Sequence, residues 1–437
     1  MSINKPYLLL ITLIIFPLFI SCGTNSDSGE PPFTACENGL VLDLFPCNNV
    51  GLYSRVTLEE MNGTRGNDLW GWTDPATSKE YALVGLTDGV SFVDVTNPAE
   101  PVFVGKLEES TASSTATPVP AHDEEAGDFK DSSAWRDLKV YQNYMFVVSE
   151  ERGHGMQVFD LERIRNRETT PENFTQDALY TEISNAHNIA INEASGYAYI
   201  VGSTSGEQCA EFGGLHIVDI KNPLDPAFAG CHVEPEAGGV IANGYIHDTQ
   251  CVIYRGPDSN FTGREICFSS SERKLLISDV TDKSSPETVA VLSYDGNQYS
   301  HQGWLSEDHS HFYMNDELDE RNNHHNTRTY VWDLSDLENP QITGFFNHST
   351  ASVDHNLYIY DDIAYQANYT AGLRVLDVSG RDPESIREMG YFDTTPENEE
   401  PVFAGLWSNY PFFSGNKIIV SDINQGIFIL RYDRGQF

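Results

Sequence analysis

Four histidines recur at one position of a repeated sequence pattern, each at the start of a predicted strand. They are His187, His247, His301 and His355. Neutral imidazole is a preferred ligand of Zn²⁺ and Cu²⁺, so four imidazoles that converge on one axis indicate a transition-metal or substrate site. The structural alternative is that each imidazole hydrogen-bonds the backbone of the neighbouring repeat and fastens the two repeats together. Both interpretations remain open from the sequence.

Carboxylates accompany these histidines on the same predicted face. Asp68, Asp137 and Asp248 occupy the next position of the repeat and are expected as alternative ligands or as partners of the ligands. Loops of the same face add acidic groups at Glu150, Glu151, Glu207, Asp316, Glu317, Asp319 and Glu320, followed by His324 and His325. Such clusters can hold Ca²⁺ or act as acid and base beside a metal, but their spacing matches neither an EF-hand nor an HExxH helix. The structural alternative is a solvated acidic loop.

The sequence contains no motif of a common enzyme class. It lacks a GxSxG elbow, a Walker phosphate loop, a dinucleotide fingerprint and a haem-binding CxxCH. We therefore assign no catalytic residue and expect a binding or scaffold protein that presents an acidic, histidine-lined face to a protein, a glycan or a cation. The alternative is a metal-dependent extracellular hydrolase or oxidoreductase, with Zn²⁺, Cu²⁺ or Ca²⁺ as its cofactor.

A repeat positions these side chains. Its core alternates apolar residues and usually ends in Asp, and it covers residues 90–95, 156–161, 215–220, 275–280, 329–334, 373–378 and 427–432. Period-two alternation of β-branched and aromatic residues predicts strands, and the regular recurrence predicts a repeat array. With three further strands each, the seven units form antiparallel blades. The sequence therefore predicts an all-β protein, a seven-bladed β-propeller. The Asp is expected to cap the turn that follows it.

The two ends of the chain predict how the ring closes. The last repeat ends after its third strand, whereas residues 52–58 form a strand that precedes the first blade and lacks a partner of its own. This N-terminal strand is expected to complete the last blade, because closure removes the exposed sheet edges.

The N-terminus carries an export signal. Lys5 precedes an apolar run over residues 7–20, and Ser21-Cys22 ends it, which predicts a signal peptide over 1–21. Residues 19–22 resemble a bacterial lipobox, so Cys22 is the expected lipid anchor and residues 22–35 a lipidated, flexible tether. The propeller then occupies 36–437, with a flexible insertion at about 108–133. We expect a monomer in the bacterial cell envelope, held by lipid at the outer membrane or the cell surface.

Six cysteines remain after Cys22. An even number in an exported chain predicts disulfides, and we expect Cys36–Cys47, Cys209–Cys231 and Cys251–Cys267. A thiolate metal site is the alternative, although no CxxC spacing occurs.

The charge of the chain restricts its partners. Of the 437 residues, 65 are Asp or Glu and 26 are Lys or Arg, a formal net charge of −39. Such a surface repels phosphates, which excludes nucleic acid and anionic bilayers as electrostatic partners and leaves cations and basic surfaces. The 40% hydrophobic residues suffice for a large core.

Long motifs of the chain resemble those of a known family. They include Cys36-Glu-Asn-Gly, Asn67-Asp-Leu-Trp-Gly-Trp, His247-Asp-Thr-Gln-Cys-Val, His301-Gln-Gly-Trp-Leu and Asp354-His-Asn-Leu-Tyr. In these motifs the chain is similar to the choice-of-anchor B family of secreted bacterial propellers, which is related to the LVIVD-repeat proteins. The resemblance implies a surface anchor, whose lipid version matches Cys22. It implies no reaction, because propellers support many activities.

Overall fold

The computed structural model describes residues 31–110, 135–167, 170–206, 213–239 and 244–434. The described residues from 32 onward form one compact unit. The predicted signal peptide, Cys22 and nearly all of the predicted insertion at 108–133 lie outside the described residues. Within the described ranges, no helix has the length and apolar character needed to cross a membrane.

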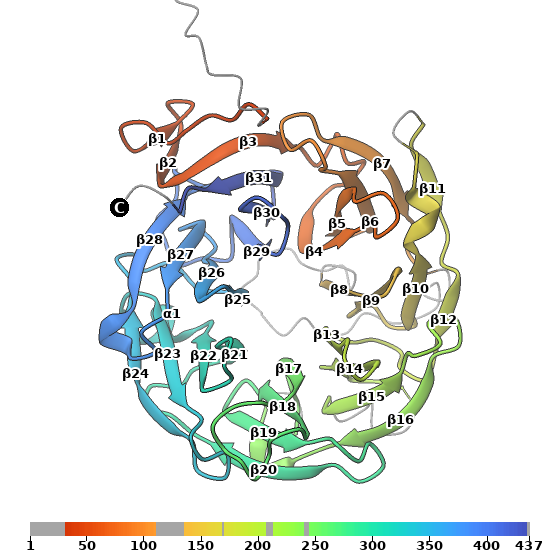
Figure 1. Ribbon diagram of the computed structural model, residues 1–437, viewed down its shortest axis with the longest axis vertical. Helices are drawn as coiled ribbons and strands as arrows, with labels where there is room; N and C mark the ends of the chain where they lie inside the picture. Colours follow the sequence, from red (N-terminus) through yellow and green to blue (C-terminus); the bar gives the residue numbers. More distant parts are fainter. Residues whose placement is uncertain (1–30, 111–134, 168–169, 207–212, 240–243, 435–437) are drawn as a thin grey trace, which may run out of the picture. The chain divides into compact units, whose positions relative to one another are not determined.

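Seven sheets are arranged around a central axis, each with its innermost strand next to that axis (Figure 1). The innermost strands are β4 (Gly66–Thr73), β8 (Arg136–Tyr141), β13 (Asn188–Asn192), β17 (Asp248–Ile253), β21 (Ser300–Leu305), β25 (Leu357–Tyr360) and β29 (Leu406–Tyr410). The second strands are β5 (Glu80–Leu86), β9 (Tyr144–Ser149), β14 (Tyr197–Val201), β18 (Glu265–Ser270), β22 (His311–Asp316), β26 (Ile363–Ala367) and β30 (Lys417–Asp422).

The predicted repeats form the third strand of every blade. These strands are β6 (Gly89–Asp94), β10 (Met156–Asp160), β15 (Leu215–Asp219), β19 (Leu275–Asp279), β23 (Arg328–Asp333), β27 (Leu373–Asp377) and β31 (Gly426–Tyr432). The outer strands are β7 (Val102–Leu107), β12 (Ala178–Tyr180), β16 (Ala227–His232), β20 (Glu287–Leu292), β24 (Gln341–Asn347), β28 (Arg387–Phe392) and β3 (Val50–Val56). The prediction of an all-β, seven-bladed propeller is confirmed.

The N-terminal strand closes the ring. β3 pairs antiparallel with β31, from Val50 opposite Tyr432 to Val56 opposite Ile427, and so provides the outer strand of the seventh blade. The strand begins two residues before the predicted range of 52–58, but its partner is the predicted one. The edge of β31 is therefore covered by the start of the chain.

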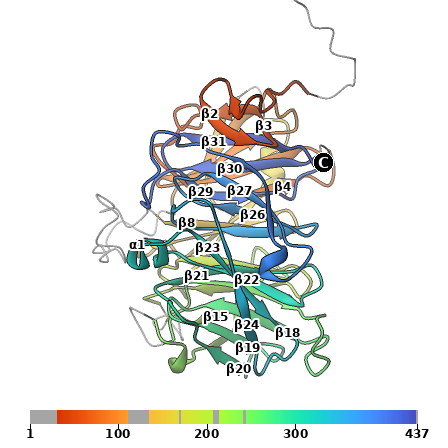
Figure 2. The same cartoon turned by 90° about the vertical axis from the view of Figure 1, so that its left-hand side faces the viewer.

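Short segments also cover two outer edges, which the sequence did not predict. β11 (Glu172–Phe174) lies in sequence between β10 and β12 of the second blade, but it pairs parallel with β7 of the first blade. β2 (Phe45–Asn48) pairs with β28 of the sixth blade, and β1 (Leu40–Val41) extends that sheet. The small helix α1 (Asp319–Asn323) lies in the loop between β22 and β23 and protrudes at one face of the ring (Figure 2). Single 3₁₀ turns lie at Leu161–Ile164, Pro235–Ala237 and Pro383–Ser385.

The repeated Asp caps a turn, as predicted. The carboxylate of Asp94 accepts a hydrogen bond from the backbone N–H of Thr96 at 2.9 Å, and Asp279 accepts one from Thr281 at 3.0 Å. The same bond recurs in other blades, at Asp160, Asp219, Asp333 and Asp377. The side chain satisfies a backbone donor that the end of the strand leaves unpaired.

Two of the three predicted disulfides are present. Cys36 bonds Cys47, and Cys251 bonds Cys267 from directly opposite positions on β17 and β18. Cys231 is disulfide-bonded as well, and its predicted partner Cys209 lies outside the described residues.

Loss of the Cys251–Cys267 bond should destabilise the fourth blade. The bond closes a loop with a sequence separation of 16, and a loop of this length contributes about 3 kcal/mol in the chain-entropy account. The double variant Cys251→Ser, Cys267→Ser should lower the free energy of unfolding in urea by about that amount. Unchanged urea denaturation would show that the bond does not stabilise the blade.

Candidate functional site

The four histidines form a continuous row at one end of the central channel. The ring centroids of His187 and His247 are 4.1 Å apart, those of His247 and His301 are 4.4 Å apart, and those of His301 and His355 are also 4.4 Å apart. Each residue lies within two residues of the start of an innermost strand, so the radial repetition of the blades brings them together. The rings line a small cavity of about 10 Å³ together with Trp407.

Backbone carbonyls of the next blade orient two of these rings. Nδ1 of His247 donates to the carbonyl oxygen of His301 at 3.0 Å, and Nδ1 of His355 donates to that of Trp407 at 2.6 Å. A carbonyl only accepts, so Nδ1 carries the proton and Nε2 of each neutral ring keeps its lone pair. The predicted fastening of blades by imidazole is therefore present at these two of the four rings, where Nε2 is not used by it.

Glu317 extends from the loop after β22 toward the Nε2 atoms of His301 and His355. Its Oε2 lies 3.7 Å from Nε2 of His301, and its Oε1 lies 3.7 Å from Nε2 of His355. Ligand atoms of His247, His301 and Glu317 all lie within 4.8 Å of one another. Ligands bound tetrahedrally at about 2.1 Å are about 3.4 Å apart, so a small contraction would close this set around one ion.

The protonation of this cluster suits a metal ligand. Burial and the neighbouring histidines lower the pKa of His247 and of His301 well below the usual value. Burial lowers the pKa of His355 to about 3. All three rings are thus neutral. Among the described residues, neither ring nitrogen of His301 has a hydrogen-bond partner, although the side chain is only 1% exposed. Tyr369 donates its hydroxyl to Oε1 of Glu317 at 2.9 Å and so orients the carboxylate.

His187 differs from the other three histidines. Its Nδ1 lies 2.6 Å from Oε1 of Glu150. Burial by itself would lower the pKa of His187, but the hydrogen bond and the charge of Glu150 outweigh it and raise that pKa above the usual value. The structure therefore places two predicted site residues, His187 and Glu150, in an ion pair beside the cluster.

Asp68, Asp137 and Asp248 lie inside the channel and connect blades, rather than forming the open acidic face that the sequence suggested. Asp137 accepts from the backbone N–H of Ile189 in the next blade at 2.9 Å, and Asp248 accepts from the side chain of Asn188 at 3.2 Å. Burial, followed by the charge of Asp137, raises the pKa of Asp68 to about 7 and that of Asp248 to about 8.

The expectation of a solvated acidic loop is wrong for Asp316, Asp319 and Glu320, which are all buried. Oδ2 of Asp316 accepts from the hydroxyl of Tyr294 at 2.8 Å, and Asp319 accepts from that of Tyr330 at 2.6 Å. These bonds draw the loop inward and thereby carry Glu317 to the histidines. Asp354 was not predicted as a site residue, although it begins one of the family-like motifs. It is also buried, and burial together with the charge of Glu320 raises its pKa well above the usual range.

Sequence reasoning also missed an aromatic set further along the innermost strands. Each of these residues lies three positions after the repeat position that the histidines occupy in four of the blades. The set lines a second cavity and consists of Trp70, Trp304, Tyr358 and Tyr410. The recurrence of an aromatic residue at this fixed offset was the available signal.

Comparisons with known proteins support the repeat. The family model of the LVIVD repeat matches residues 74–108 and 184–232. The protein is a seven-bladed propeller with LVIVD repeats. The matched ranges contain β5 to β7 of the first blade and β13 to β16 of the third, including the turn-capping Asp94 and Asp219.

No curated protein matches the chain. Among solved structures, the computationally designed Ika8 protein is similar with a TM-score of 0.44 and 9% identity, over 81% of this chain and 80% of that chain.

Proposed function

We propose that this protein is an extracytoplasmic binding propeller that holds one divalent transition metal ion between His247, His301 and Glu317. The observation that carries the proposal is the approach of their ligand atoms to within 4.8 Å of one another. Two imidazoles and one carboxylate suit Zn²⁺ or Cu²⁺ better than Ca²⁺, which prefers six or more oxygen ligands. His355 is outside this set of three, although its Nε2 lies 3.7 Å from Oε1 of Glu317.

The surroundings of the site favour a held ion over a catalytic one. Catalytic zinc sites keep a position open for water and substrate. Here the three ligands are buried, and the cavity between the rings measures about 10 Å³. An ion in this place would join the fourth blade to the fifth and would stabilise the ring, because metal affinity adds to the stability of the folded state.

The metal proposal is tested by the composition of the protein itself. After equilibrium dialysis against Zn²⁺ and removal of free ion, elemental analysis should find one equivalent of zinc per chain. The variant Glu317→Gln should retain much less, whereas Glu287→Gln, an exposed carboxylate on β20, should retain the full equivalent. Zinc-free wild-type protein after dialysis would contradict the proposal.

We further infer that the propeller is a lipoprotein of the choice-of-anchor B type, displayed on the bacterial envelope. The lipobox-like sequence before Cys22 and the family-like motifs support this inference. The disulfides support it too, because such bonds persist outside the cytoplasm.

The anchor is tested by the variant Cys22→Ser. Wild-type protein should partition into the detergent phase and carry acyl chains on its N-terminal peptide, because more than one chain gives stable membrane binding. The variant should stay in the aqueous phase or remain unprocessed. A mature wild-type N-terminus without acyl groups, as read by mass spectrometry, would exclude a lipid anchor.

A further inference from the structure

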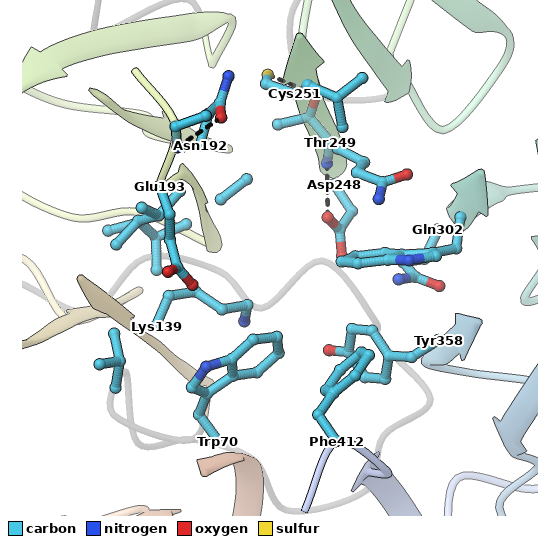
Figure 3. A pocket seen from close by; sticks show the side chains of 18 of the residues that line it. Trp70, Lys139, Asn192, Glu193, Asp248, Thr249, Cys251, Gln302, Tyr358 and Phe412 are labelled. Carbon is cyan, nitrogen blue, oxygen red and sulfur yellow. Dashed lines mark hydrogen bonds between the residues drawn. The ribbon is translucent and has the colours of Figure 1, made fainter. Parts of the chain in front are cut away.

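A second and larger cavity lies further along the innermost strands than the histidine row. Its volume is about 410 Å³, and its lining comes from the innermost strands of all seven blades together with Phe412 and the turn after β13. Figure 3 shows Trp70, Tyr358 and Phe412 on one side of this space, while Asp248, Lys139 and Glu193 reach into it from other sides. Five of its lining residues are aromatic.

The aromatic side chains form one connected wall. Trp70 packs edge-on against Tyr358 at 5.6 Å and against Tyr410 at 5.2 Å between ring centroids. Trp304 packs against Tyr358 at 5.0 Å, and Phe412 packs against Tyr410 at 5.2 Å. Trp70, Trp304, Tyr410 and Phe412 are only half-buried, so parts of these rings remain open to the cavity.

Acidic side chains outnumber basic ones around this wall. Asp248 and Glu193 line the cavity, and Asp68 and Asp137 lie close behind Asp248, against the single cation of Lys139. The ammonium of Lys139 lies 4.8 Å from the ring centroid of Trp70 and forms an ion pair with Asp137. The wall therefore already holds one cation by the face of a ring.

The neutral polar groups of the cavity are mostly occupied. The amide of Gln302 donates to and accepts from the backbone of Leu357, at 3.0 and 2.9 Å. The side chain of Asn192 donates to Glu265 at 2.6 Å. A sugar requires several available donors and acceptors, whereas a cation requires ring faces and acidic side chains. The second set is the one that this cavity offers.

We infer that this cavity binds a small organic cation, an amine or a quaternary ammonium, between the aromatic wall and the carboxylates of Asp248 and Glu193. Ring faces attract a desolvated cation, and acidic side chains beside them attract it as well. This site is separate from the proposed metal centre and does not depend on it. Four of its aromatic residues lie three positions after the repeat position that the histidines occupy, so the two sites use different residues of the repeat.

The test compares a cation with a neutral molecule of the same shape. Isothermal titration of the mature protein with choline should give saturable binding, and 3,3-dimethylbutan-1-ol, which replaces the charged nitrogen by carbon, should bind at least about tenfold more weakly. Glucose is the probe for the sugar alternative. Absence of choline binding, equal binding of the alcohol, or binding of glucose alone would overturn the inference.

Variants locate the binding site. Trp304→Leu should weaken choline binding by about tenfold, and Glu193→Gln should weaken it without affecting the fold, because Glu193 is exposed. Phe345→Leu removes an exposed ring on β24, outside the cavity, and should leave choline binding unchanged. Both cavity variants should keep their zinc content, so failure of this inference is distinguishable from failure of the metal site. Full choline affinity in Glu193→Gln and Trp304→Leu would place the ligand elsewhere and contradict the inference.

Discussion

Deletion of β3 (Val50–Val56) should turn the folded ring into an aggregating chain. The deletion removes the outer strand of the seventh blade, together with the buried side chains of Val50, Leu52 and Val56. It also exposes the edge of β31, and an unpaired edge is a template for pairing with other chains. Size-exclusion chromatography should show aggregates, and the cooperative thermal transition should be lost or move to a much lower temperature.

The control for this deletion keeps the strand and changes one exposed side chain. Arg55→Ser retains every backbone pair of β3 with β31 and should elute and melt like the wild type. If the deletion variant also elutes and melts like the wild type, the N-terminal strand does not hold the ring closed.

The double variant His247→Ala, His301→Ala should lose metal binding and keep its fold. It removes two of the three proposed ligands. Loss of a residue that only hydrogen-bonds a metal ligand typically lowers metal affinity 10–100-fold, so loss of two ligands should lower zinc affinity by more than about 100-fold. The metal-free variant loses one fastening bond, from Nδ1 of His247 to His301, which contributes about 1 kcal/mol. Zinc titration and thermal melting of the metal-free protein measure the two effects separately.

His311→Ala is the matched control, since this histidine lies at the start of β22, outside the row. It should bind zinc like the wild type. If the row of histidines is purely structural, the results should be reversed. The wild-type protein should then bind no zinc, and the metal-free double variant should be strongly destabilised.

The fold was largely predictable because its signals are local. Alternation in segments such as Val90–Asp94 identifies a strand, and the capping Asp marks its end, so the blade order follows from the sequence alone. Closure was predictable as well, because only β31 lacked an outer partner. The pairing of β11 with β7 was not predictable, since a segment of three residues carries no pattern that identifies a partner strand in another blade.

The candidate site was predictable only in part, for a physical reason. Equivalent positions of a radial repeat must meet at the axis, so the meeting of His247, His301 and His355 follows from the repeat. The position of Glu317 depends on a loop that Tyr294 and Tyr330 draw inward, and such bonds between distant residues leave no local signal. Burial of Asp137 likewise depends on a backbone donor of the next blade.

X-ray absorption spectroscopy of the zinc-loaded protein is the sharpest test of the metal site, because it reports the atoms bound to the ion. We expect a first shell of nitrogen and oxygen at about 2.0–2.2 Å, with outer-shell scattering from at least two imidazole rings. The imidazole scattering should disappear in His247→Ala, His301→Ala. A shell of oxygen alone, without imidazole scattering in the wild type, would contradict a metal site between His247, His301 and Glu317.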